Sequence, residues 1–145
     1  MDGSTLRTRR GLGETVLLAA IVMLTGSAIA ADSQNVGAAI KPVLSQELAN
    51  VPGKNLTAVV VTYGPGGKSP RHHHAGSVFA YVLSGSIRSQ VSGQGPARVY
   101  KTGEAFFEPP GSEHLVSENA SVAEPASLLA VFVSDTGAQL TVLDH

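Results

Sequence analysis

Short runs of apolar residues alternate with turn residues along most of the chain after residue 50. The runs are rich in β-branched and aromatic side chains, and groups of glycine, proline and serine separate them at intervals of roughly 8–12 residues. No segment of this region has a convincing helical period. Strands of this spacing are typical of an all-β sandwich or barrel. The expected strands cover 56–63, 78–83, 87–91, 98–100, 105–107, 114–117 and 128–133.

The region before these strands is less regular. Residues 43–48 fit either a strand or one helical turn, and residues 50–55 have clear turn chemistry. A chain of 145 residues is long enough for one domain and too short for two ordinary ones. We therefore expect a signal peptide over 1–30, an N-terminal extension over 31–54 and one β-barrel domain over 55–145.

The signal peptide is expected from the pattern of the first thirty residues. Three arginines within the first ten residues precede the apolar run 16–24, and Ala28 and Ala30 then form the small-x-small pattern of a cleavage site. The run is shorter than the roughly 20 residues of a membrane-spanning helix. A short uncleaved anchor and the twin-arginine export route are the alternatives. We expect a periplasmic or secreted protein without stable membrane association after cleavage.

Composition narrows the chemistry. Hydrophobic residues make up 43 % of the chain, which is enough for a buried core. The formal net charge of -1 and the absence of a basic patch after the N-terminal arginines give no reason to expect a nucleic-acid partner. The chain has no cysteine, which excludes disulfides, zinc-thiolate sites, iron–sulfur clusters and thiol nucleophiles. Nitrogen and oxygen must therefore hold any metal ion.

Four of the five histidines are candidates for metal ligands; the fifth, His145, is the last residue and is most simply solvated. Alternate residues of a strand share a face, so His72 and His74 should point one way and His73 the other. His114, just after a Pro-Pro-Gly turn, is the remaining histidine of the domain. Imidazole is a good ligand for zinc, copper, iron and nickel. A surface histidine tract that binds metal adventitiously is the alternative on these residues alone.

Two motifs in order resemble those of the cupin superfamily. Residues 66–85 match its first motif, in which a glycine, five residues, His-x-His and a later glycine are in register. Residues 103–114 match the second motif, a glycine, five residues, Pro-x-Gly, two residues and a histidine. The resemblance covers about residues 55 to 135. It implies a double-stranded β-helix, the cupin or jelly-roll barrel, with one metal ion inside on His72, His74 and His114.

The chain departs from the first motif at its glutamate, because the two possible positions hold Val78 and Phe79. Loss of that carboxylate leaves three neutral imidazoles, a ligand set that some dioxygenases of the superfamily use. Glu104 and Glu108 are possible substitutes, and by alternation they share one face. We expect a surface position for each, because exposed glutamate is the norm. No general base can be named from the pattern, and Glu108 is only a candidate.

The resemblance implies a mononuclear, metal-dependent oxidoreductase that acts on a small organic substrate in the manner of a dioxygenase. Fe²⁺ is the favoured ion, with Mn²⁺, Zn²⁺, Ni²⁺ or Cu²⁺ as alternatives. A non-catalytic periplasmic module that binds a small molecule or metal is the second hypothesis, since fold does not fix function. An isomerase or lyase with a Lewis-acid metal is the third. The resemblance also implies a homodimer formed through outer sheets. The aromatic residues are expected in the core or at this contact: Phe79, Tyr81, Phe106, Phe107 and Phe132.

Overall fold

The computed structural model describes residues 37–145. The expected signal peptide lies outside these residues, so the export route stays a prediction. The described part of the chain forms ten strands and contains no helix. It accordingly has no helix that is long and apolar enough to cross a membrane.

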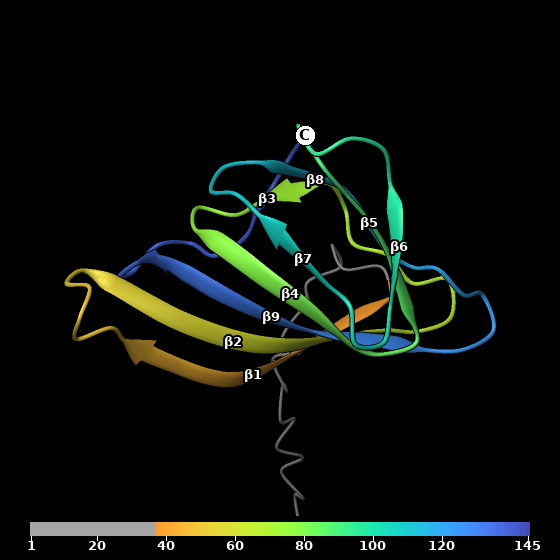
Figure 1. Cartoon of the computed structure of the whole chain (residues 1–145), viewed down its shortest axis with the longest axis horizontal. Helices are drawn as coiled ribbons and strands as arrows, with labels where there is room; N and C mark the ends of the chain where they lie inside the picture. Colours follow the sequence, from red (N-terminus) through yellow and green to blue (C-terminus); the bar gives the residue numbers. More distant parts are fainter. Residues whose placement is uncertain (1–36) are drawn as a thin grey trace, which may run out of the picture.

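The strands form two five-stranded antiparallel sheets that face each other (Figure 1). One sheet has the order β1 (Ala38–Glu47), β2 (Lys54–Tyr63), β9 (Ala126–Asp135), β4 (Ser77–Ser84) and β7 (Ala105–Glu108). The other has the order β10 (Val142–Leu143), β3 (His72–His73), β8 (Glu113–Asn119), β5 (Ser86–Val91) and β6 (Arg98–Lys101). The chain crosses repeatedly between the sheets, as in a jelly-roll barrel. The expectation of an all-β fold of this type is confirmed.

Alternation along β4 and β9 sets the inner face of the first sheet. In β4, Val78, Ala80 and Val82 are buried, whereas the residues between them are exposed. The neighbouring β9 alternates in the same way. Because successive strand residues point to opposite faces, this pattern places one apolar surface toward the other sheet. The resulting core lies between the two sheets and contains Tyr63, Val78, Ala80, Val82, Ile87, Phe106, Ala126, Leu128, Ala130 and Phe132.

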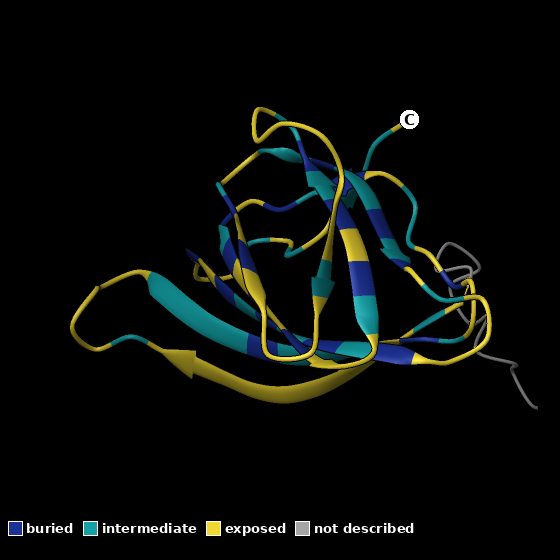
Figure 2. Ribbon diagram, turned by 45° about the vertical axis from the view of Figure 1, so that its right-hand side comes forward, coloured by how far each residue is buried: buried dark blue, intermediate teal, exposed yellow. Residues whose placement is uncertain are grey.

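The segment 43–48, which fitted a strand or a helical turn, lies almost entirely within strand β1. This strand pairs with β2 along its length, with one bulge between Pro42 and Leu44. The first sheet therefore begins before residue 55, where the barrel domain was expected to start. Nearly all of β1 is exposed (Figure 2), because it forms the edge of its sheet.

A tight turn connects the two sheets beside the histidines. Pro109, Pro110 and Gly111 follow β7, and Gly111 has a φ of 72°, a left-handed conformation that glycine adopts without steric cost. The backbone N–H of Gly111 donates to the carbonyl of His74 at 2.8 Å. This hydrogen bond holds the turn between β7 and β8 against the histidine segment that follows β3.

Candidate metal centre

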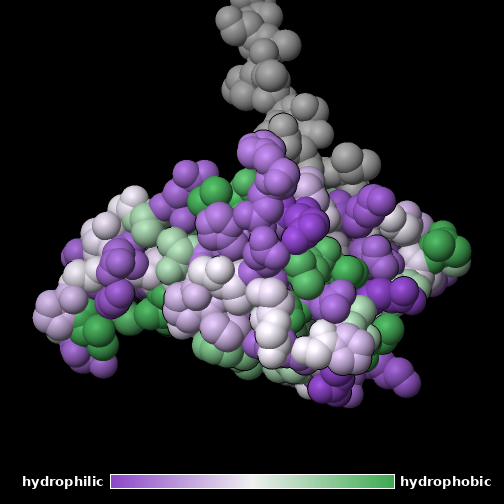
Figure 3. Space-filling model, turned by 90° about the horizontal axis from the view of Figure 1, so that it is seen from above, coloured by the Kyte–Doolittle hydropathy of each residue, from purple (hydrophilic) through white to green (hydrophobic). Residues whose placement is uncertain are grey.

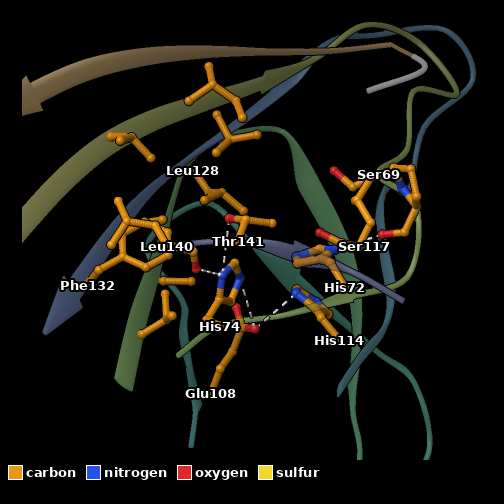
Figure 4. A pocket seen from close by; sticks show the side chains of 18 of the residues that line it. Ser69, His72, His74, Glu108, His114, Ser117, Leu128, Phe132, Leu140 and Thr141 are labelled. Carbon is orange, nitrogen blue, oxygen red and sulfur yellow. Dashed lines mark hydrogen bonds and ion pairs between the residues drawn. The ribbon is translucent and has the colours of Figure 1, made fainter. Parts of the chain in front are cut away.

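Three buried histidines meet between the sheets. His72 on β3 pairs directly with His114 on β8, and His74 follows β3 on the same side of the chain. One potential ligand atom from each lies within 4.8 Å of the others, and the side chains point toward one another (Figure 4). Three imidazoles at this spacing can hold one metal ion. The described residues thus bring together the three histidines that the sequence nominated.

Backbone carbonyls fix the orientation of two of these rings. Nδ1 of His72 lies 2.7 Å from the carbonyl oxygen of Pro70, and Nδ1 of His74 lies 2.7 Å from that of Leu140. A carbonyl oxygen can only accept a hydrogen bond, so both Nδ1 atoms carry the proton. The Nε2 atoms of these neutral rings then present free lone pairs. This is how metal-binding histidines are commonly oriented in proteins.

The third histidine is held from the opposite side. Nε2 of His114 is hydrogen-bonded to the hydroxyl of the buried Ser89 at 2.8 Å. Its Nδ1 is buried and has no hydrogen-bond partner. A buried polar atom without a partner is costly. A bound metal ion would satisfy this nitrogen.

Glu108 adds a carboxylate to the centre, and the expectation of a surface position for it is wrong. The residue is 3 % exposed. Its Oε2 lies 3.1 Å from Nδ1 of His114 and 3.6 Å from Nε2 of His74, without a hydrogen bond to any group. The physical reason is register, because β7 alternates with Phe106 and Glu108 inward. Glu104 precedes the strand, is exposed as expected, and accepts a hydrogen bond from the backbone N–H of Lys101.

The electrostatics of the centre favour a cation. Burial lowers the pKa of His72 from 6.5 to about 4 and also lowers the pKa of His74. Burial acts to raise the pKa of Glu108, but the neighbouring His114, with His74 and His72, outweighs it and holds that pKa below 4.5. The carboxylate of Glu108 is therefore buried in its ionised form, and burial keeps the neighbouring imidazoles of His72 and His74 neutral. Such an isolated charge is strongly unfavourable unless a positive group compensates it.

A cavity of about 360 Å³ contains these four side chains. Most of its remaining wall is apolar and comes from β2, β4, β7 and β9, with Leu140 and Leu143 beyond them. Three lining residues are exposed and mark the opening: Ile40, Gln139 and Thr141. A largely apolar cavity with a few convergent polar groups is typical of a small-molecule site.

The remaining histidine of the tract points elsewhere. His73 is partly buried, and its Nδ1 lies 2.7 Å from a carboxylate oxygen of Asp144. Neither residue lines the cavity. The basic residues near the motifs are also outside it, since Arg71 pairs with Glu113 on the surface. The terminal His145 is exposed.

Sequence reasoning missed several contributors to the centre. Ser89 occupies an inward position of β5, and only the alternation of that strand could have indicated it. The carbonyl of Leu140 lies 66 residues from His74 in sequence, and no side-chain pattern marks a backbone oxygen. A hydrogen-bonded group of Tyr63, Ser69 and Ser117 also lines the cavity.

Comparisons with solved structures agree with this architecture. The DMSP lyase from Ruegeria pomeroyi superposes with a TM-score of 0.61 at 24 % identity, over 81 % of this chain and 56 % of that chain. A cupin-like protein from Thermotoga maritima superposes with a TM-score of 0.58 at 20 % identity, over 74 % of this chain and 75 % of that chain. An oxalate oxidase in complex with the substrate analogue glycolate superposes with a TM-score of 0.59 at 24 % identity, over 77 % of this chain and 57 % of that chain. These identities show a common fold alone.

The chain spans only 44 % of the length of another structural neighbour, a DMSP lyase. The activities of these longer proteins therefore cannot be assigned to this chain. A search of curated proteins finds no match. The family model of the cupin domain matches residues 59–132, about half of the chain and all strands from within β2 to within β9. Together with the barrel and its inward histidines, this match shows that the chain belongs to the cupin family.

Proposed function

We propose that the protein is a mononuclear, metal-dependent oxidoreductase of the dioxygenase type that acts on a small organic substrate. The observation that carries the proposal is the convergence of His72, His74 and His114 on one point of a mostly apolar cavity. The free lone pairs of the first two and the orphaned nitrogen of the third suit a divalent cation. Fe²⁺ is the favoured ion, because imidazole with carboxylate is a frequent donor set for non-haem iron.

The residues of the chain would position the substrate and exclude water, and a bound iron ion would supply the redox chemistry. The rings of Phe132 and Phe106 lie edge-on to His74 and His114, with centroids 5.0 and 5.9 Å apart. They cover one side of the centre with apolar surface. Elsewhere in the cavity wall, the hydroxyl of Tyr63 is hydrogen-bonded to those of Ser69 and Ser117, and this group offers polar contacts to a substrate.

The cavity wall also favours a class of substrate. None of the residues that line it within 37–145 is lysine or arginine. Away from the metal ion itself, the wall therefore offers no cationic side chain to a second charged group of a substrate. A small, uncharged and partly apolar molecule of up to roughly drug-fragment size fits a cavity of about 360 Å³.

We also propose export and dimer formation. The arginines, apolar run and small residues of the first thirty positions support export. Exposed apolar side chains on the outer face of the first sheet support a homodimer, as Phe79 pairs across the strands with Phe107 and both are about half exposed. Tyr81 continues this row on β4. Figure 3 shows that apolar side chains also reach the surface in separate places on the face it presents.

The test is to purify the full chain, measure its metals by elemental analysis and follow oxygen uptake with catechols, diketones, flavonols and thiols. Iron with substrate-dependent oxygen consumption is the expected result. Zinc or nickel without oxygen uptake, but with ligand-dependent thermal stabilisation, would instead indicate a binding module. Turnover without oxygen would indicate a lyase or isomerase.

A further inference from the structure

One acidic side chain of the cavity has no partner that explains its burial. The carboxylate of Glu108 extends from β7 in the first sheet toward the histidines, which come from the second sheet (Figure 4). None of the salt bridges within residues 37–145 joins it to lysine or arginine. A carboxylate is rarely buried without a cation or a set of donors.

Its contact with His74 joins two lone pairs, and its contact with His114 has no hydrogen-bond geometry. Nε2 of His74 is unprotonated, because Nδ1 of that ring donates to the carbonyl of Leu140. This Nε2 nevertheless faces Oε2 of Glu108 at 3.6 Å. Nδ1 of His114 faces the same oxygen at 3.1 Å, and neither atom makes a hydrogen bond. Nε2 of His74 and Oε2 of Glu108 are facing acceptors, and such a pair repels unless a cation lies between the two atoms.

Glu108 lies directly across the sheet from Val78, one of the two positions at which the first motif would have its glutamate. Val78 on β4 is its direct cross-strand partner, is 1 % exposed and also lines the cavity. Side chains directly opposite in an antiparallel pair have Cβ atoms about 5 Å apart. A carboxylate rooted at either position therefore reaches nearly the same space.

We propose that Glu108 is the fourth protein ligand of the metal and supplies from β7 the carboxylate that Val78 does not supply from β4. The inference rests on the proposed metal centre. An anionic oxygen ligand lowers the net charge at the ion. It also shifts the preference of the site toward Mn²⁺ and Fe²⁺, because carboxylates suit harder ions and imidazoles alone suit nickel, copper and zinc.

The experiment is a calorimetric titration of the chelator-treated full chain with Mn²⁺ and, separately, Ni²⁺. Glu108→Gln should weaken Mn²⁺ binding by about 100-fold or more, since loss of even an outer partner of a ligand costs about 10- to 100-fold. Ni²⁺ binding should fall by a smaller factor. The exposed Glu104→Gln is the matched control and should bind both ions like the wild type.

A double variant tests the exchange of positions. Val78→Glu combined with Glu108→Val keeps the same pair of side chains and should recover most of the Mn²⁺ affinity that Glu108→Val loses. It also keeps the proposal testable if a single variant fails to fold, which circular dichroism reports. A double variant that binds Mn²⁺ no better than Glu108→Val would overturn the exchange.

The outcomes separate this inference from the function on which it rests. If Glu108→Gln binds both ions with wild-type affinity while His74→Ala binds neither, the carboxylate is not a ligand but the histidine centre stands. If His74→Ala also binds both ions normally, the metal centre itself is refuted.

Discussion

Acid should destabilise the metal-free protein through the buried imidazole of His72. The pKa of this group is about 4 in the folded protein, against the ordinary histidine pKa of 6.5. Between these two values the unfolded chain binds more protons than the folded one, so the free energy of unfolding falls as the pH falls. The contribution is fully present above pH 6.5 and is lost progressively down to about pH 4.

The size of the effect follows from the two values. Their difference of about 2.5 corresponds to roughly 3 kcal/mol when both states have titrated. Between pH 8 and pH 5 the loss from His72 alone is roughly 2 kcal/mol. With a denaturant slope of about 1.5 kcal/mol/M, the urea midpoint should fall by roughly 1.3 M over this interval. His74, whose pKa is also lowered by burial, adds a loss in the same direction.

The assay is urea unfolding of the full chain in a chelator at several pH values from 8 to 5. This interval lies above the ordinary glutamate pKa of 4.5, and the pKa of Glu108 is lowered in the folded protein, so its carboxylate contributes little to the loss. His72→Gln should reduce the loss by roughly 2 kcal/mol relative to the wild type. His145→Gln is the control and should keep the full loss, because this side chain is exposed in the folded protein. Equal losses in the wild type and His72→Gln would refute the reasoning.

Three further predictions concern the centre and its support. His74→Ala should remove most of the bound metal measured by elemental analysis, whereas His73→Ala should change it little, because the two rings face opposite ways; equal loss in both would contradict the strand register. Ser89→Ala removes the hydrogen bond to His114 on β8 and should weaken Mn²⁺ binding about tenfold in the calorimetric titration. An unchanged affinity would show that the ring of His114 needs no support from Ser89. Gly76→Ala places a Cβ against the carbonyl oxygen of Val133, a backbone neighbour that cannot easily move, and should lower the free energy of unfolding in urea by about 3 kcal/mol. A stability equal to that of the wild type would mean that the start of β4 moves away from β9 at little cost in free energy.

Alternation and turn chemistry were sufficient to predict most of the sheet. The expected strands at 78–83 and 87–91 correspond to β4 and β5, because the first is a continuous apolar run, the second alternates apolar and polar residues, and a glycine follows each strand within two residues. Strands β3 and β10 contain only two residues each, which is too short for any period to show. Strand β1 was ambiguous because it is an edge strand exposed on both faces, so no buried face selects its pattern.

The histidines of the centre could be nominated from spacing, but the carboxylate could not be placed. Alternation showed that Glu104 and Glu108 share a face without showing which face lies inward. Burial of one and exposure of the other depend on where β7 begins, since Glu104 precedes the strand and Glu108 ends it. The pairing of Glu108 with Val78 is a contact between distant segments, and no local pattern encodes it.

The carbonyl that orients His74 has a consequence for how the protein acquires its ion. Leu140 follows β9, so a ribosome makes all three histidines before it makes the group that sets one of their tautomers. Until this segment is in place, Nδ1 of His74 lacks both of its hydrogen-bond partners, which are Leu140 and Thr141. We therefore expect the ring of His74 to take its metal-binding orientation only after the segment between β9 and β10 has docked.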